Sequence, residues 1–599
     1  GTITSAGTIS IDSTVATLAG TQTLTNKTLT SPKVNEDVAV TSTATELNTL
    51  DGVTAGTISA SKAVIVDSNK DISGFRNITS TGNLTVDGGT IKLDGNYPDG
   101  TGNVALGDTA LDSVSSTGTQ NTAIGNKAGT AITTGDANTA VGFCALITTS
   151  TGSNNTAIGD RSLRNNTGGE NTSVGAFSLE ANVGGECNTA VGRTALCGNT
   201  TGDANIAVGF QALKANTTAS NNTAVGFESL KLNTTGTFNT GSGAFSLDAN
   251  TIGGCNSGYG FNALGGNTEG GLNTSMGANS MRCNTTGDNN VGLGACALFD
   301  NTTADNNTAI GFCSLKSNTT GTTNTALGSN ALRDTTTGDR NIGIGSNAIR
   351  NATTACCNIA IGVSAMQNAS TGNDNTAVGN AALQTNNTGA NNTAVGALSL
   401  DANTTASNNV AIGMSAMTTN TTGHSNVAVG TSALQSNDTA EQNVAVGYQS
   451  LFSNVGAGLQ NIAIGACSLY GQSSNCSYKN IGIGFTAGKC ITTGTDNAFI
   501  GNGAGVNITT GKFNSIIGSA LSGVAGAAGE ALTTGSCNVA LGNGALKLTS
   551  TASNNVAVGT LALGANTTAS NNTAVGFCSL QANTTGRHNT GLGTCALKL

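Results

Sequence analysis

The side chains with the widest scope for chemistry in this 599-residue chain are two histidines and 15 cysteines. His424 and His588 are far apart in the sequence, and neither stands beside the nucleophile and acid that a catalytic triad needs. The cysteine spacings match no zinc-binding motif. We therefore expect a protein that is not an enzyme and that holds no metal and no cofactor.

The cysteines do show one regularity. Cys296 and Cys313 are 17 residues apart, and so are Cys578 and Cys595. Seventeen residues is also the period of the chain from residue 103 onward. If each period is one coil of a stack, the two members of each pair lie about 5 Å apart at Cα, within reach of a disulfide. The alternative is that these thiols stay free and act as small apolar fillers.

The period comes from a unit that recurs 29 times from Asn103 to the end of the chain. It runs Asn, Thr/Val/Ile, Ala, Val/Ile, Gly, two variable residues, Ala/Ser, Leu, two variable residues, Asn-Thr-Thr-Gly and two variable residues, as in NTAVGFESLKLNTTGTF from Asn222 to Phe238. We number these positions 1 to 17. Because Asn at position 1 and Gly at position 5 recur in all 29 copies, the backbone geometry is expected to repeat with them.

The unit predicts an all-β fold, a parallel β-solenoid or β-roll with one coil per repeat. Positions 2 and 4 alternate as in a short strand, positions 8 and 9 predict a second extended piece or a bend, and NTTG is typical of a turn. Seventeen residues are too few for a helix pair or a propeller blade. At a rise of about 4.8 Å, the coils would form a rod on the order of 140 Å long.

The recurring residues predict how the coils hold together. Asn at positions 1 and 12 would form amide ladders between coils, and Gly at position 5 suits a positive φ or a close backbone approach. Leu at position 9 is expected inside, together with Val or Ile of position 4. In two representative coils these ladder residues are Asn222, Gly226, Leu230 and Asn233, and Asn392, Gly396, Leu400 and Asn403.

Position 3 bears on the oligomeric state. It is Ala, Gly or Ser in 27 of the 29 copies, although it points to the strand face opposite positions 2 and 4. Three chains packed around a common axis would require small residues there, which favours a homotrimer. The alternative is that position 3 lies inside a narrow single-chain coil.

Two stretches carry resemblances to known proteins. NVAIGMSAM from Asn409 and NVAVGYQSL from Asn443 resemble the head repeats of trimeric autotransporter adhesins, which implies a β-roll of three interlocked chains. TQTLTNKTLTSPK from Thr21, TATELNTLDGV from Thr43 and KAVIVDSNKDISGFRNITSTGNLTV from Lys62 resemble phage tail-fibre shafts, especially those of marine phages. This second resemblance implies a homotrimeric fibre on a virion. Such fibres often carry a self-cleaving C-terminal chaperone domain, and a chain that ends inside a coil would fit either cleavage or truncation.

The resemblances and the repeat together predict the domain organisation. We expect a fibre shaft or attachment segment at 1–102, built of short β units with a short helix near 43–50, where Thr43 and Glu46 form a capping box. The solenoid follows at 103–599, with irregular coils at 443–538. The largest irregularity predicts a receptor-contact loop, or else a tolerated insertion, with the candidate residues Ser519, Leu521, Val524 and Glu530.

Phenylalanines at positions 6 and 7 form a further pattern. They are expected either to make exposed apolar rows or to pack against neighbouring coils, and they include Phe143, Phe210, Phe227 and Phe245.

Composition argues against some classes of function. Only 9% of residues are charged and the net charge is −9, which argues against a nucleic-acid partner. No run of 18 apolar residues occurs, so we expect no membrane insertion. The expected function is a structural fibre of a virion, a phage tail or capsid fibre, that provides reach and binds a glycan or protein receptor on a host. Its location would be the virion surface or the extracellular space. A bacterial trimeric surface adhesin and a non-adhesive extracellular filament are the alternatives.

Overall fold

The computed structural model describes residues 99–456, 458–472, 477–520 and 526–598. The chain divides into two units, 1–92 and 93–599, and the described residues all belong to the second. The short helix expected near 43–50 and the short β units expected before residue 99 lie outside the described residues.

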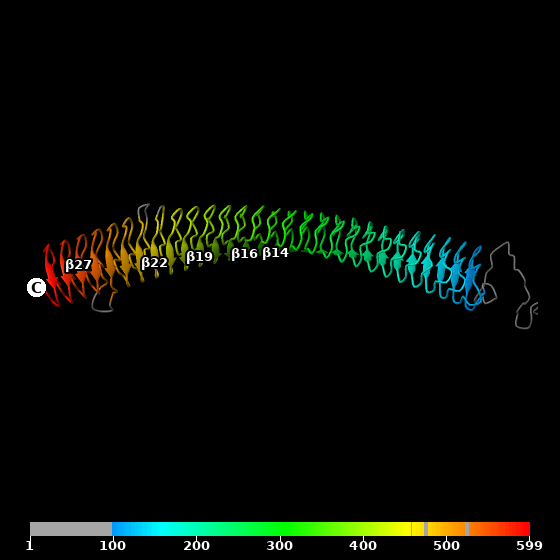
Figure 1. Ribbon diagram of the computed structural model, residues 1–599, viewed down its shortest axis with the longest axis horizontal. Helices are drawn as coiled ribbons and strands as arrows, with labels where there is room; N and C mark the ends of the chain where they lie inside the picture. Colours follow the sequence, from blue (N-terminus) through cyan, green and yellow to red (C-terminus); the bar gives the residue numbers. More distant parts are fainter. Residues whose placement is uncertain (1–98, 457, 473–476, 521–525, 599) are drawn as a thin grey trace, which may run out of the picture. The chain divides into compact units, whose positions relative to one another are not determined.

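The described unit is a parallel β-solenoid, as the repeat predicts (Figure 1). Each coil contributes one strand of three residues, formed by positions 2 to 4, and the described ranges contain no helix. The strands are β1 (Val104–Leu106), β2 (Thr122–Ile124), β3 (Thr139–Val141), β4 (Thr156–Ile158), β5 (Thr172–Val174), β6 (Thr189–Val191), β7 (Ile206–Val208), β8 (Thr223–Val225), β9 (Thr240–Ser242), β10 (Ser257–Tyr259), β11 (Thr274–Met276), β12 (Val291–Leu293), β13 (Thr308–Ile310), β14 (Thr325–Leu327), β15 (Ile342–Ile344), β16 (Ile359–Ile361), β17 (Thr376–Val378), β18 (Thr393–Val395), β19 (Val410–Ile412), β20 (Val427–Val429), β21 (Val444–Val446), β22 (Ile462–Ile464), β23 (Ile481–Ile483), β24 (Ala498–Ile500), β25 (Ser515–Ile517), β26 (Val539–Leu541), β27 (Val556–Val558), β28 (Thr573–Val575) and β29 (Thr590–Leu592).

These strands form one 29-stranded parallel sheet in which each strand pairs with the next along the chain. The register is direct, so that Thr223 pairs with Thr240 and Val225 pairs with Ser242. Equivalent positions of successive coils therefore stack on one another. This stacking turns each repeated residue into a row that runs the length of the solenoid.

The rest of each coil turns rather than extends, which settles the alternative at positions 8 and 9 in favour of a bend. The amide of Ala212 donates to the carbonyl of Gly209 at 3.4 Å, and the amide of Asn216 donates to the carbonyl of Leu213 at 3.1 Å. Between these turns the backbone bonds the next coil, as when the amide of Leu213 donates to the carbonyl of Ser229 at 3.0 Å. Backbone hydrogen bonds thus link the coils outside the sheet as well as within it.

The interior of each coil is narrow, and the strand residue that it holds differs from the one predicted. Ala224 at position 3 and Leu230 at position 9 are both 0% exposed, whereas Val225 at position 4 is 41% exposed. The expectation that Val or Ile of position 4 lies inside with Leu is therefore wrong. A 17-residue coil has room for one leucine from the bend and only a methyl group from the strand, so the small residue of the strand faces inward. Position 3 lies inside its own coil, as the single-chain alternative required.

Candidate functional site

The first amide ladder runs through position 1. The backbone amide of Asn222 donates to Asn205 Oδ1 at 3.0 Å, and Asn222 Oδ1 in turn accepts from the amide of Asn239 at 2.9 Å. The same contact recurs where the amide of Asn392 donates to Asn375 Oδ1 at 2.9 Å. Each side chain at position 1 therefore joins two coils, as predicted.

The second ladder runs through position 12. Asn233 Nδ2 donates to Asn216 Oδ1 at 2.9 Å, and Asn403 Nδ2 donates to Asn386 Oδ1 at 2.7 Å. All four side chains are buried. A buried amide is stabilising only when it is hydrogen-bonded, and here each coil supplies the partner of the next.

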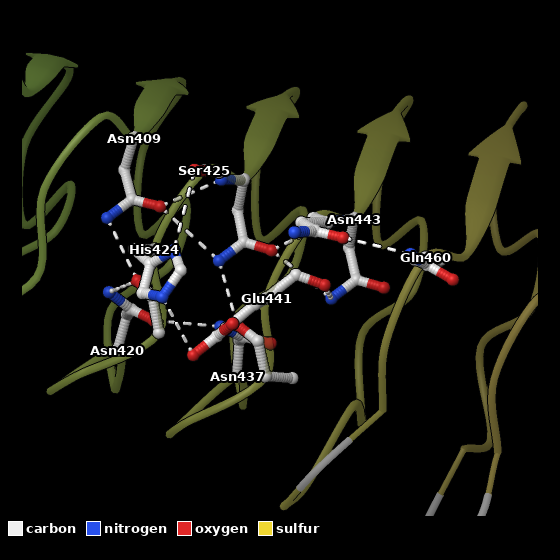
Figure 2. A network of polar contacts seen from close by, with 12 residues as sticks. Asn409, Asn420, His424, Ser425, Asn437, Glu441, Asn443 and Gln460 are labelled. Carbon is white, nitrogen blue, oxygen red and sulfur yellow. Dashed lines mark hydrogen bonds and ion pairs between the residues drawn. The ribbon is translucent and has the colours of Figure 1, made fainter.

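In most coils that have Asn at position 12, the two ladders meet at one backbone carbonyl, a contact that no side-chain pattern marks. The carbonyl of Ala406 accepts from Asn392 Nδ2 at 2.8 Å and from Asn403 Nδ2 at 3.0 Å. Position 15 thus ties position 1 to position 12 across the interior. Figure 2 shows the two ladders side by side, with Asn409 and Asn443 in one and Asn420 and Asn437 in the other.

Gly at position 5 is required by both φ and space. Gly226 has a φ of 141° and Gly396 a φ of 130°. A β-carbon on Gly226 would lie 2.6 Å from the carbonyl carbon of Gly243, the equivalent glycine of the next coil. Both parts of the prediction for this position, a positive φ and a close backbone approach, are confirmed.

Leu at position 9 is inside, as predicted, but the sequence does not reveal that its backbone is left-handed. Leu230 and Leu400 are both 0% exposed, with φ values of 51° and 50°. Left-handed leucine is rare because its Cβ crowds the backbone. Burial of the side chain and the coil-to-coil hydrogen bonds together hold this conformation.

The outward face of the sheet is formed by positions 2 and 4 of all 29 strands, with Thr or Ser at position 2 in 16 strands and Val, Ile or Ala there in the other 13. We call it the sheet face. Position 4 is apolar in every strand except β9, which has Ser242, and neither outward position carries a charged residue in any strand. Ile124 is 39% exposed and Ile412 is 40% exposed. Parallel sheets are usually covered on both faces, and in this coil the outward face is open.

The irregular coils keep the sheet in register. β25 still pairs with β26 across the longest interval, and the amide of Asn538 donates to Asn514 Oδ1 at 3.0 Å. The described residues of the candidate receptor loop therefore lie outside the sheet and the first ladder. Ser519 and Glu530 are half-buried at its two ends, while Leu521 and Val524 lie outside the described residues. The receptor contact at this loop stays a prediction.

The cysteine pairs stack as the period requires. The 14 described cysteines are free thiols; Cys313 and Cys578 are buried, and Cys595 is exposed. Burial raises the pKa of the Cys313 thiol, and the neighbouring Cys296 thiol raises it further. A disulfide between the members of either pair stays a prediction.

Aromatic rings form a row along one edge of the coils, which we call the phenylalanine row. Ring centroids are 5.3 Å apart for Phe210 and Phe227, 5.3 Å for Phe227 and Phe245, and 6.0 Å for Phe245 and Phe261. Phe227 is 45% exposed and Phe261 is 52% exposed. These rings contact their neighbours in adjacent coils and also remain open to solvent, so both alternatives for them hold in part.

His424 forms a surface contact. Its Nε2 lies 2.9 Å from Glu441 Oε1 of the next coil, and both side chains are at least one-third exposed (Figure 2). An exposed pair of this kind contributes little to stability. No group of three or more His, Cys, Asp or Glu residues in the described ranges could hold a metal ion.

The comparisons with known proteins do not place the chain in a family. No protein-family model matches it, and neither does any curated protein. Within the residues that the structure covers, no helix has the length and apolar character needed to cross a bilayer.

Proposed function

We propose that this chain is the rod of a virion fibre, a phage tail or capsid fibre, that provides reach and attachment to a host surface. The observation that carries the proposal is the unbroken stacking of 29 strands in one sheet, reinforced by amide ladders. Such a stack resists bending because a bend would stretch hydrogen bonds in coil after coil. The role is structural rather than catalytic, at the virion surface or elsewhere outside the cell.

A homotrimer is part of the proposal, with the sheet face as its interface. The 29 strands span 28 steps of about 4.8 Å, and positions 2 and 4 are about 7 Å apart, so the strip covers on the order of 900 Å², about half of it the apolar row of position 4 and the rest a mixed row of Thr, Ser, Val, Ile and Ala at position 2. Soluble monomers rarely expose contiguous apolar patches larger than a few hundred Å². Only a partner with the same axial repeat can match every coil, and another copy of the chain has that repeat. The number three follows from the resemblance to adhesin heads and tail fibres.

The oligomer is tested by the native mass of the purified chain, measured by light scattering after size exclusion. We expect a value near three times 58.6 kDa. Substituting Val225→Glu together with Val395→Glu should give single chains, because both residues lie on the sheet face. The matched control, Thr235→Glu with Thr405→Glu on exposed turns, should remain trimeric. A native mass near one chain for the unsubstituted protein would overturn the trimer.

The biological role is tested by labelling with an antibody raised against the solenoid. Gold label on the appendages of virus particles, together with binding of the purified chain to host cells, is the expected result. Label on a bacterial envelope would instead indicate a surface adhesin. Rods that bind no cell would indicate a non-adhesive filament.

A further inference from the structure

Next to Phe261, where the phenylalanine row ends, the coil surface is hollowed to a volume of about 440 Å³. Gly265 and Gly266 stand there at positions 10 and 11, and no other coil has glycine at both. Neither has a positive φ, and a β-carbon on Gly265 would meet only side-chain atoms, whereas one on Gly266 would lie 2.6 Å from the carbonyl oxygen of Arg282 in the next coil. Position 10 carries Lys231 and Phe299 in nearby coils. The hollow therefore forms where this coil lacks a side chain at position 10.

Polar groups border this hollow. Asp248 and Arg282 occupy position 10 in the coils on either side of Gly265, and both line the hollow. A β-carbon on Gly265 would lie 3.2 Å from Asp248 Oδ1 and would overlap the side-chain amide oxygen of Asn262. Asn262 Nδ2 donates to Asn279 Oδ1 at 3.4 Å, which leaves the Asn262 amide oxygen turned toward the gap. Two acceptors and one cationic donor thus border the same space.

We propose that this hollow binds a hexose unit of a surface glycan, with the sugar ring against Phe261 and its hydroxyls bonded to Asp248 and Arg282. The inference rests on the proposed attachment role, because it names the chemical class of the receptor. The site is separate from the receptor-contact loop expected at Ser519–Glu530.

The chemistry of the lining matches a neutral sugar. One face of a hexose ring presents C–H groups with partial positive charge, which pack favourably on the negative face of an aromatic ring. Neighbouring hydroxyls of the same ring donate to a carboxylate, and the guanidinium donates to hydroxyl or ring oxygens. A concave apolar wall with a few convergent polar groups is the common form of a small-ligand site.

The position of the hollow on the coil also suits a receptor site. Its lining residues stand at positions 6, 7, 10 and 11, outside the strand, so packing of chains through the sheet face does not use them. Phe261 has no aromatic neighbour in the following coil, which carries Ala278 at the same position. The last ring of the row is therefore free to receive a ligand.

Three variants of the full-length chain separate binding from folding. Gly265→Leu fills the hollow at a position that accepts larger side chains in other coils. Gly564→Leu is the matched control, because Gly564 also stands at position 10, in a remote coil. Asp248→Asn keeps the shape and removes the charge. Burial raises the pKa of Asp248, so the charged carboxylate is disfavoured in the fold and its replacement is not expected to destabilise it.

The experiment is saturation-transfer NMR with methyl α-D-glucoside, methyl β-D-galactoside and methyl α-D-mannoside, each at millimolar concentration. We expect at least one hexoside to bind the unsubstituted chain and Gly564→Leu equally. Binding should be lost in Gly265→Leu and weakened about tenfold or more in Asp248→Asn, because hydrogen bonds to a charged carboxylate become weaker bonds to a neutral amide. Circular dichroism and thermal unfolding check that each variant is folded.

Two results would overturn the inference: no transfer to any of the three hexosides, or full transfer to a folded Gly265→Leu variant. Attachment to host cells is measured in parallel with the same variants. If the unsubstituted chain and Gly265→Leu attach equally well, the sugar site is wrong and the fibre function stands. If a hexoside binds at the hollow but the chain attaches to no cell, the site stands and the fibre function fails.

Discussion

The ring of Phe499 lies in the space that a side chain on Gly488 would occupy, since a β-carbon there would be 2.8 Å from Phe499 Cε2. Gly488 and Gly505 stand at position 9, where most coils have Leu, and Phe499 stands at position 3, where most have Ala. Phe499 is 0% exposed. The large interior side chain therefore comes from position 3 of the strand instead of position 9 of the bend, and the interior stays filled.

This exchange predicts a strong coupling between the two positions. Phe499→Ala alone should lower the free energy of unfolding by about 3–5 kcal/mol because it leaves a cavity. Gly488→Leu alone should lower it by about 1–3 kcal/mol because it overfills the interior. The double variant should be more stable than the sum of the two losses implies. Leu fits the backbone at this place, because Leu230 has nearly the same positive φ as Gly488.

The coupling is measured by urea unfolding of both single variants and the double variant in a double-mutant cycle. Phe499→Ala with Leu546→Ala, a pair of buried residues in coils that are not neighbours, is the control and should be additive. Additive losses for the Phe499 and Gly488 pair would contradict the exchange of volume.

A second prediction concerns a gap in the second amide ladder. In the described part of the chain, Asn318 Oδ1 and Thr335 Oγ1 are buried without hydrogen-bond partners, because Thr stands at position 12 where Asn is usual. In Thr335→Asn, the new amide nitrogen can donate to Asn318 Oδ1, and one amide oxygen then faces Ala352 unpaired. The net change is one fewer unpaired buried group, which should raise the free energy of unfolding by about 1 kcal/mol.

The opposite substitution serves as the control for that gain. Asn233→Thr interrupts an intact ladder, since Asn233 Nδ2 donates to Asn216 and Asn233 Oδ1 accepts from Asn250 at 2.8 Å. It should lower the free energy of unfolding by about 1–3 kcal/mol. Chemical unfolding of the two variants checks both signs, and a Thr335→Asn variant less stable than the parent chain would refute the ladder argument.

A third prediction concerns the glycine corner. Gly226→Ala should lower the free energy of unfolding by more than about 3 kcal/mol. The φ of Gly226 is unfavourable for any other residue, and the new β-carbon would press on the backbone of Gly243. Gly184→Ala is the matched control, because Gly184 has no positive φ and a β-carbon there would meet no atom within 4 Å. The two melting temperatures are compared by circular dichroism. Equal decreases in melting temperature for the two variants would show that neither the positive φ nor the close backbone approach makes Gly226 harder to replace.

The sequence predicts the architecture well because the repeat is itself the structural unit. A fixed period with invariant Asn and Gly is sufficient to infer stacked coils, both ladders and the positive φ at Gly226. It does not predict which strand face is inside. Branched residues such as Val225 are usually buried, but the interior of this coil holds Leu230 and leaves room only for the methyl group of Ala224.

The hollow beside Phe261 is also hard to predict from the sequence, because its residues come together only when the coils stack. Gly265 and Gly266 are visible as an unusual pair, but glycines are frequent in this chain. Asp248 and Arg282 are separated from Gly265 by one coil each, so that only the stacking brings them to one hollow. The shared carbonyl of the two ladders was missed because no side-chain pattern marks a backbone acceptor.

The last prediction concerns the pH at which the stacked thiols react. The thiolate is the reactive form of cysteine, and the pKa of Cys313 is raised above its usual value, first by burial and then by Cys296. Disulfide formation between Cys296 and Cys313 should therefore be slow at pH 7. Its rate should keep rising with pH beyond about 8.5, where an unperturbed thiol is already half ionised.

Peptide mapping by mass spectrometry after exposure to oxidised glutathione over a range of pH measures this rate. Exposed Cys255, for which mixed-disulfide formation with glutathione is followed in the same samples, is the internal reference. Cys313 should react more slowly than Cys255 at pH 7, and the difference should shrink as pH rises, because deprotonation then no longer limits Cys313. Equal rates at pH 7 would mean that burial in the coil does not restrain the Cys313 thiol.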